Sequence, residues 1–201
     1  CGITNLDDAL GVVEAGAGAL GFNFYRRSPR YISPQDARRI IEQLPLSVLA
    51  VGVFVNEAEP EIVARIAEES KVRAIQLHGD EAPAYARALK NFFVIKALRV
   101  SEDFVAESVR EFETEAILLD SFDLTERGGT GRTFDWEVAQ RVRELVPKLY
   151  LAGGLSVENV AEAVERVQPY AVDACSRLET APGRKDLERV RNFISAAHVK
   201  P

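Results

Sequence analysis

A carboxylic acid and a thiol are the two side chains of this chain best suited to proton transfer. Asp120 ends the apolar run 116–119, and a carboxyl group at the end of a buried strand is partly desolvated, which suits a general acid. Cys1 precedes a helix expected from about Leu6, and a thiol near a helix N-terminus can serve as a base or nucleophile. The residues alone favour catalysis for Asp120 over a cap or loop contact. For Cys1 they favour a small buried side chain.

Two glycine-rich segments could bind a phosphate. Gly153-Gly154 follows a strand-like run and precedes a helix that we expect Ser156 to cap. Backbone N–H groups at such a turn, beside a helix N-terminus, form an anion site, although a tight turn without a ligand has the same pattern. Gly129-Thr130-Gly131 is a second flexible loop of this kind. Two such loops after successive late strands favour a phosphorylated substrate.

Other polar residues lie in loops or at strand ends. Arg30 shares a loop with two further arginines, and its guanidinium could bind an anionic group of a substrate. His78 ends a strand-like run and could donate a proton or only make a structural hydrogen bond. Lys96 is expected to line the mouth of the fold as a charge rather than to form a Schiff base. His78 and His198 are far apart and lack metal-ligand spacing, so no metal site is predicted.

Short apolar runs alternate with amphipathic helical patterns along the whole chain. The predicted strands are 19–25, 48–55, 74–78, 92–98, 116–121, 149–152 and 170–175. Most of these runs are continuously apolar, which is typical of parallel strands buried on both faces. Besides the residues above, Asn23, Gln76, Asp173 and Cys175 lie at strand ends, where a barrel places its chemistry.

The predicted helices cover 6–15, 33–44, 59–70, 82–91, 102–112, 136–145, 157–167 and 186–197. Ser33 can cap the second helix, with Pro34 at its first position, and Gly16 suits the end of the first. Asp135 and Ser156 precede the sixth and seventh helices, where caps would lie.

Eight helices and seven strands predict an α/β fold, a (β/α)8 barrel that forms one domain over residues 1–201. No strand precedes the first helix, so we expect the first strand largely upstream of Cys1. The chain begins at Cys1 and contains no Met, and we therefore expect upstream residues to have been processed away, trimmed or left out of the numbering. A doubly wound open sheet is the alternative. It usually has its glycine-rich phosphate turn after the first strand, whereas here those turns come late, as in barrels.

The composition excludes several classes of protein. Hydrophobic residues make up 47% and charged residues 28% of the 201 residues, as in soluble globular domains. No apolar run reaches the roughly 18 residues of a membrane span. The net charge of −6 argues against a nucleic-acid partner. Two cysteines exclude a disulfide framework and fit a reducing compartment. We therefore expect a cytoplasmic protein without nucleic-acid or membrane partners.

Taken together, the motifs resemble the phosphoribosylanthranilate isomerase family of tryptophan biosynthesis. The matching segments, in family order over nearly the whole chain, are 1–5, 20–25 with 28–32, 51–56, 76–79, 118–120, 128–131 with 134–136, 151–155 and 169–173. No single segment is decisive, but the ordered set is highly specific. The family is a (β/α)8 barrel whose first strand ends at the cysteine.

The resemblance implies an Amadori rearrangement of N-(5-phosphoribosyl)anthranilate to 1-(2-carboxyphenylamino)-1-deoxyribulose 5-phosphate. Asp120 would be the general acid that protonates the furanose ring oxygen, and Cys1, as a thiolate, the general base that takes the C2 proton. This division makes physical sense because one group must start protonated and the other deprotonated. The reaction moves only protons, so no cofactor is implied.

The resemblance also implies the contacts that hold the substrate. Arg30 would pair with the anthranilate carboxylate. The full set of expected substrate-binding residues is Arg30, Asn23, His78 and Asp173. The expected phosphate-binding residues are Gly129, Thr130, Gly131, Gly153, Gly154, Ser176 and Arg177. Whether the protein is a monomer or a homodimer stays open.

One departure from the family pattern concerns the phosphate site. After the last strand the family usually has Ser-Ser-Gly-Val-Glu, whereas this chain has Cys175-Ser176-Arg177-Leu178-Glu179. A glycine lets the backbone approach a phosphate closely. Arg177 instead brings a side chain, which could give a guanidinium to the phosphate or point to solvent.

Three alternative functions remain at this point. A relative that also isomerises the analogous histidine-pathway intermediate would need two strong phosphate sites, and only one cluster is visible. An indole-glycerol-phosphate synthase would need a lysine and glutamate constellation that Lys96 alone does not supply. A phosphosugar-binding barrel without catalysis is the non-enzyme alternative, and the retention of Cys1 and Asp120 argues against it.

Overall fold

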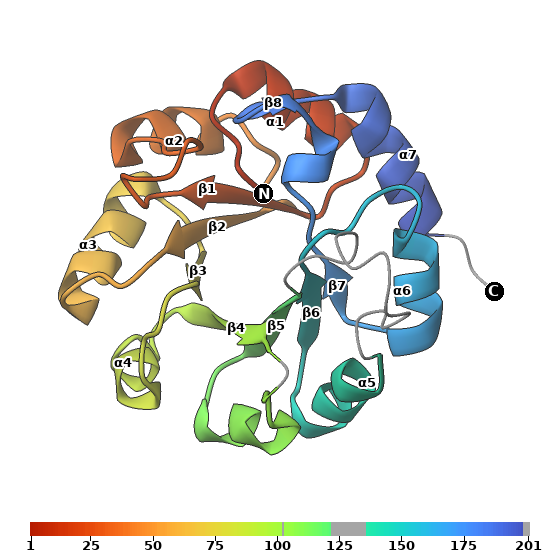
Figure 1. The fold of residues 1–201 in the computed structure, drawn as a ribbon. Helices are drawn as coiled ribbons and strands as arrows, with labels where there is room; N and C mark the ends of the chain where they lie inside the picture. Colours follow the sequence, from red (N-terminus) through yellow and green to blue (C-terminus); the bar gives the residue numbers. More distant parts are fainter. Residues whose placement is uncertain (102, 122–135, 199–201) are drawn as a thin grey trace.

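The computed structural model describes residues 1–101, 103–121 and 136–198. Seven parallel strands form one sheet in chain order, curled around a centre with helices on its outside (Figure 1). The strands are β1 Ala19–Asn23, β2 Leu49–Phe54, β3 Ala74–Leu77, β4 Phe93–Val100, β5 Ala116–Ser121, β6 Leu149–Ala152 and β7 Ala171–Val172. This arrangement confirms the barrel-type α/β fold predicted from the alternating pattern.

The helices follow the predicted order. They are α1 Leu6–Glu14, α2 Pro34–Ile41, α3 Pro60–Ser70, α4 Pro83–Ala88, α5 Trp136–Leu145, α6 Val160–Val167 and α7 Leu187–Ala197. Ser33 caps α2 by accepting a hydrogen bond from the backbone of Asp36, with Pro34 at the first position, as predicted. Gly16 follows α1 with a φ of +105°, as expected for a glycine beyond a helix end.

Apolar side chains fill both faces of the curled sheet. The larger cluster lies between the strands and the helices and includes Phe22, Phe54 and Leu119. The smaller cluster joins residues of β2 to β6, among them Val51, Ile95 and Leu118. Burial on both faces explains why the strands appear in the sequence as continuous apolar runs.

The two edge strands, β1 and β7, are not paired with each other. The first residues of the chain lie between them: the backbone nitrogen of Cys1 donates to Ala174 O at 3.1 Å, and the backbone N–H of Ile3 donates to Gly21 O at 3.0 Å. The chain start therefore takes hydrogen bonds that a neighbouring strand would take. It also brings Cys1 beside Gly21, in the middle of β1.

Three local predictions were wrong, and a fourth is not tested. The fifth predicted helix, 102–112, is a 3-10 helix, η1 Ala106–Glu111, and β7 covers two residues instead of 170–175. Ser156 does not cap α6, because the helix begins at Val160 after Asn159. Asp135, the other predicted cap, lies outside the described residues.

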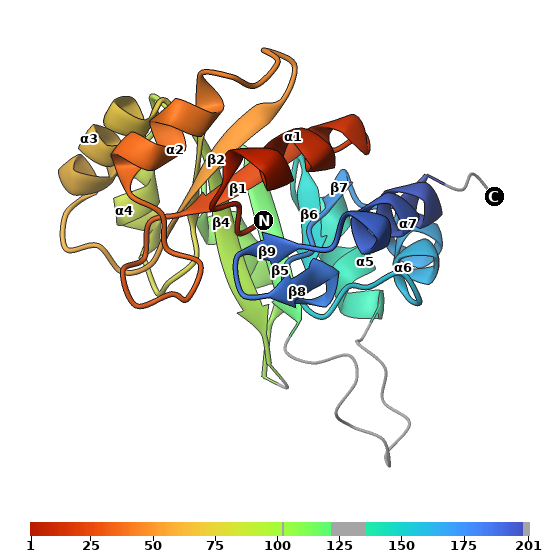
Figure 2. The same cartoon turned by 90° about the horizontal axis from the view of Figure 1, so that it is seen from above.

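A hairpin that we did not predict from the sequence follows β7. It is preceded by a short 3-10 helix, η2 Ser176–Leu178, and consists of β8 Glu179–Ala181 and β9 Arg184–Lys185. Figure 2 shows the same molecule from a second direction, with α1 and α7 side by side near this hairpin. The hairpin places two charged residues, Glu179 and Lys185, next to the chain start.

A search of the described helices found none that is both long enough and apolar enough to cross a membrane.

Candidate active site

Asp120 lies at the end of β5 and contacts a histidine from β3's C-terminal end. Its Oδ2 is 2.9 Å from Nε2 of His78, and Nδ1 of His78 is 2.7 Å from Nε2 of Gln76. The amide nitrogen of Gln76 can only donate, so Nδ1 carries no proton and Nε2 donates to Asp120. Within the described residues, Oδ1 of Asp120 makes no hydrogen bond. This second oxygen is therefore available to carry a proton for transfer.

A buried ion pair holds the loop that carries His78. Lys96 Nζ donates to Glu81 Oε2 at 2.7 Å and to the carbonyl of Gly79 at 2.6 Å. Glu81 in turn accepts from the backbone N–H groups of Asn56 and Gly79. Both charged side chains are only 2% exposed. The pair thus ties the ends of β2, β3 and β4 together.

The prediction that Lys96 lines the mouth as a charge was wrong. Its register partner on β3 is Leu77, a residue of the core cluster between the sheet and the helices. Alternation along a strand sends Ile95 to the other face and Lys96 to the helix side. Buried there, the ammonium requires the carboxylate of Glu81 as its partner.

Cys1 lies at the opposite side of the sheet, against β1. A Cβ on Gly21 would lie 2.7 Å from the Cys1 Sγ, so the absence of a side chain at position 21 makes room for the thiol. Asp173, just after β7, has Oδ1 3.5 Å from the backbone nitrogen of Cys1. A cavity of about 760 Å³ extends behind Cys1 between β1 and β7 and is also lined by Gln76, Asp173 and Lys185.

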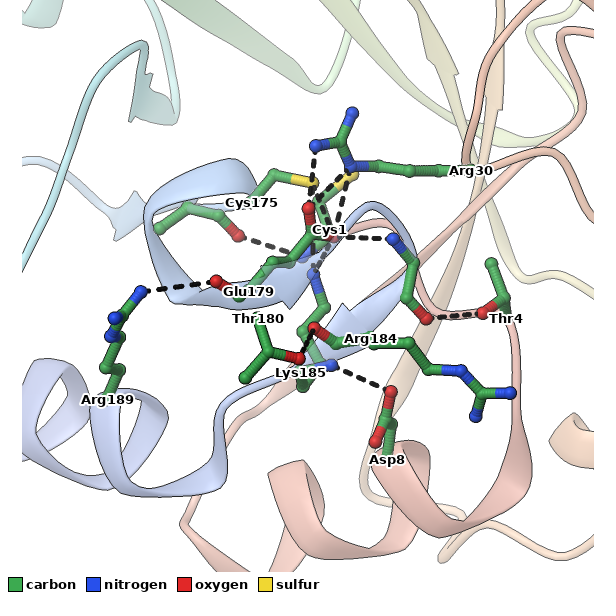
Figure 3. Close-up of polar contacts among 12 residues, drawn as sticks. Cys1, Thr4, Asp8, Arg30, Cys175, Glu179, Thr180, Arg184, Lys185 and Arg189 are labelled. Atoms are coloured by element: carbon green, nitrogen blue, oxygen red, sulfur yellow. Dashed lines mark hydrogen bonds and ion pairs between the residues drawn. The ribbon is translucent and has the colours of Figure 1, made fainter.

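Arg30 belongs to a cluster of charges centred on Glu179 (Figure 3). Its Nε donates to both carboxylate oxygens at 3.0 and 2.9 Å, and Nη2 donates to Oε2 at 2.6 Å. Lys185 Nζ donates to Oε1 at 2.8 Å, and the backbone N–H of Gly183 donates to the same oxygen at 3.2 Å. The Sγ of Cys175 lies 3.7 Å from Oε1. Sequence analysis placed Arg30 in the site but not the carboxylate that holds it.

The cluster changes how its members titrate. Burial alone would raise the pKa of Glu179, but hydrogen bonds from Arg30 and Lys185 outweigh it and lower the pKa to about 2. The hydrogen bond to Glu179 raises the pKa of Arg30. Burial raises the pKa of the Cys175 thiol, more than the nearby cations lower it. Glu179 is therefore ionised and Cys175 protonated at neutral pH.

The depressed pKa of Glu179 predicts a loss of stability in acid. Since the folded-state pKa of about 2 lies below the ordinary value of 4.5, the contribution is complete above pH 4.5 and disappears as the pH falls towards 2. The difference in unfolding free energy between wild type and Glu179→Gln should shrink over this range. Urea denaturation at pH 7, 4.5 and 2.5 measures it. The exposed Glu68→Gln variant is the control, and a difference that stays constant with pH would contradict the prediction.

The expected phosphate-binding residues are only partly described. Gly153 and Gly154 follow β6 with φ of +87° and +65°, a backbone that favours glycine. Ser176 and Arg177 are exposed at the start of η2. Gly129, Thr130 and Gly131 lie outside the described residues. The described turns after β6 and β7 are neighbours, since β6 pairs with β7.

Asn23 ends β1 and uses its side chain locally. Its Oδ1 accepts a hydrogen bond from the backbone N–H of Tyr25 at 2.9 Å, which shapes the start of the loop that leads to Arg30.

Among the described residues there is no group of three or more metal-ligating side chains.

Sequence analysis missed three charged residues that organise the site: Glu81, Glu179 and Lys185. Each lies in a polar stretch that resembles a solvated loop, and each is buried in an ion pair, Glu81 with Lys96 and Glu179 with Lys185. A weak signal existed for two of them. Pro182-Gly183 between short flanking runs is a hairpin signal, and a hairpin there places Glu179 opposite Lys185.

Comparisons with known proteins point to one family. The family described as N-(5'-phosphoribosyl)anthranilate (PRA) isomerase matches residues 1–196. The N-(5'-phosphoribosyl)anthranilate isomerase of Trichlorobacter lovleyi is 49% identical over 197 residues, covering 98% of this chain and 95% of that protein. The crystal structure of the Thermotoga maritima phosphoribosylanthranilate isomerase is 48% identical, with a TM-score of 0.88, and covers 98% of this chain and 96% of that one.

A second solved structure bears on the ligand. It is a phosphoribosylanthranilate isomerase in complex with reduced 1-(o-carboxyphenylamino)-1-deoxyribulose 5-phosphate, 45% identical with a TM-score of 0.86, covering 98% of this chain and 95% of that one. Another structure shows monomers generated from the dimeric Thermotoga maritima enzyme.

Proposed function

The chain belongs to the N-(5'-phosphoribosyl)anthranilate isomerase family, and on that premise we propose which of its residues carry out the reaction. The enzyme converts N-(5'-phosphoribosyl)anthranilate to 1-(2-carboxyphenylamino)-1-deoxyribulose 5-phosphate in tryptophan biosynthesis. The observation that carries our assignment is the contact between His78 and Oδ2 of Asp120, which leaves Oδ1 for proton transfer.

Asp120 is the general acid. A proton on Oδ1 passes to the furanose ring oxygen, the bond from C1 to that oxygen breaks, and the anilino nitrogen forms an imine with C1. The Nε2–H of His78 then donates to the carboxylate that remains, which stabilises its negative charge. General acid catalysis of this kind contributes about 10²- to 10⁴-fold.

Cys1 is the general base. As a thiolate it removes the proton from C2 of the open-chain imine, which is protonated on nitrogen. The electron pair of that C–H bond forms the C1–C2 double bond, and the π pair of the C1–N double bond returns to nitrogen, which gives an enolamine. Loss of the proton from the C2 hydroxyl and protonation of C1 then give the ketone. Asp120 on β5 and Cys1 beside β1 lie on different sides of the sheet centre, so the substrate can bind between them (Figure 1).

The remaining site residues hold the two anionic ends of the substrate. Arg30 pairs with the anthranilate carboxylate. Gly153, Gly154, Ser176 and Arg177, with Gly129, Thr130 and Gly131, hold the phosphate, and Asn23, His78 and Asp173 surround the sugar. Arg177 adds a guanidinium where the family usually has glycine.

The remaining proposals concern the domain, the location and the oligomeric state of the protein. We propose one domain over residues 1–201, a cytoplasmic location, and a monomer or homodimer as the active form. The proposed reaction transfers only protons, and side chains of this chain carry out the transfers. Light scattering coupled to size-exclusion chromatography distinguishes the two oligomeric forms.

An isomerase assay tests the proposed residues together. Freshly prepared N-(5'-phosphoribosyl)anthranilate is added to the protein, and the loss of substrate fluorescence is compared with spontaneous breakdown. We expect accelerated conversion to the ribulose product, identified by mass and retention time. Inorganic phosphate should compete, because it occupies the proposed phosphate loops. A folded protein that does not accelerate the reaction would contradict the assignment.

A further inference from the structure

We propose that Glu179 is a positioning residue that, with Lys185, makes Arg30 selective for a carboxylate on the aromatic ring of the ligand. The inference rests on the proposed role of Arg30 and deepens it. Glu179 orients the guanidinium of Arg30. Lys185 lets that guanidinium attract a second carboxylate although it already pairs with Glu179.

The orientation follows from the hydrogen bonds. Glu179 takes the Nε and Nη2 edge of the guanidinium through three contacts between 2.6 and 3.0 Å. Within the described residues, Nη1 makes no hydrogen bond or ion pair. A guanidinium is planar and offers two-point contacts along its edges. Held on one edge, Arg30 presents Nη1 and the second Nη2 hydrogen to an incoming carboxylate.

The exposures show which member of the cluster a ligand can reach. The side chains of Glu179 and Lys185 are each 3% exposed, whereas that of Arg30 is 21% exposed. In Figure 3 the guanidinium lies at the edge of the cluster, and Lys185 approaches Glu179 from the opposite side. A ligand that contacts the cluster therefore meets the guanidinium.

Lys185 gives the cluster of Arg30, Glu179 and Lys185 a net positive charge. A carboxylate paired with one arginine forms a neutral unit, which has little attraction for a second carboxylate. Lys185 adds a second positive charge 2.8 Å from Glu179, so the three groups together carry one net positive charge. Because Lys185 is buried, it contributes this charge without competing for the ligand. The cluster is thus preorganised for one anionic group.

The test compares two stable ligands. One is the reduced product, 1-(2-carboxyphenylamino)-1-deoxyribitol 5-phosphate, and the other is the same molecule without the carboxylate, 1-phenylamino-1-deoxyribitol 5-phosphate. Calorimetry gives a Kd for each, and their ratio measures selectivity for the carboxylate. The ratio is insensitive to a fraction of misfolded protein, since both ligands are measured on one preparation.

We expect Glu179→Asp, which keeps the net charge of the cluster at +1 but lacks the reach to hold the guanidinium by its edge, to reduce this ratio by about tenfold, the size of one or two hydrogen bonds to a charged group. The Kd of the ligand without the carboxylate should stay unchanged. Lys185→Met should also reduce the ratio, because the net charge of the cluster falls to zero. Glu179→Gln is the second variant at this position: it also loses the orientation of the guanidinium, but its cluster carries two positive charges, so the ratio should fall less than in Glu179→Asp. Glu107→Gln is the matched control, because Glu107 also pairs with an arginine, but on the exposed surface.

The outcomes separate this inference from the proposed function. Arg30→Met should abolish the selectivity. If it does, and the Glu179 and Lys185 variants keep the wild-type ratio, the positioning role is wrong while the role of Arg30 stands. If Arg30→Met keeps the ratio, the proposed role of Arg30 is wrong and this inference is wrong with it.

Discussion

Replacement of Asp120 by Asn is expected to lower kcat by about 10²- to 10⁴-fold, because the amide has no proton of suitable acidity for the ring oxygen. The amide is nearly isosteric with the carboxyl group, so its oxygen can still accept the hydrogen bond from Nε2–H of His78. Stopped-flow fluorescence with fresh substrate measures the loss. Binding of the reduced product should stay within a few fold, which separates catalysis from folding.

Cys1→Ala should lower kcat by a comparable factor, since it removes the base and leaves Gly21 without its close neighbour.

Asp7→Asn is the control for Asp120→Asn, because Asp7 is exposed on α1 and distant from the substrate in our assignment. Near-normal turnover in either site variant would refute the role of that residue. The two variants also differ in mechanism: with Cys1→Ala the ring-opened imine still forms, whereas with Asp120→Asn ring opening itself is slow.

Replacement of Lys96 by Met should have the largest effect on stability. It leaves the Glu81 carboxylate buried without its counter-charge, and it leaves the carbonyl groups of Leu77 and Gly79 without their donor. Removing one partner of a buried ion pair costs about 3–5 kcal/mol. Urea denaturation should show this as a lower midpoint with an unchanged slope.

The double variant Glu81→Gln with Lys96→Met should recover part of the loss, because no charge is then buried and the glutamine can still accept from the backbone of Asn56. The exposed pair of Glu107 and Arg141 supplies the comparison, and Glu107→Gln should shift the midpoint little. An unfolding free energy for Lys96→Met within about 1 kcal/mol of wild type would show that the pair does not hold these strand ends. His78 lies in the loop that the pair fixes, so a smaller loss of kcat should accompany the loss of stability.

Local patterns in the sequence determined the fold. Continuous apolar runs identified the seven strands because parallel strands buried on both faces carry few polar residues. Cap residues such as Ser33 and stop signals such as Gly16 located helix ends, since their effects depend on neighbours within one turn. Asp120 was predicted for a related reason: a polar residue after a buried strand lies at the end where barrels place their chemistry. The role predicted for Cys1 came only from the family resemblance.

The tertiary structure alone decided which charges meet. Glu179 is 149 positions from Arg30 in the chain, and His78 is 42 positions from Asp120. Nothing local distinguishes Glu81 from a solvated glutamate, and the weak hairpin signal at Pro182-Gly183 does not show that Lys185 is buried. Lys96 shows most clearly what local patterns do not predict. Side chains alternate along β4, so Ile95 points to one face of the sheet and Lys96 to the other. There the folded loop that carries Glu81 supplies the opposite charge. Periodicity predicts elements because it is a property of short segments. The pairing of charges requires the curled sheet, which brings the ends of distant strands together.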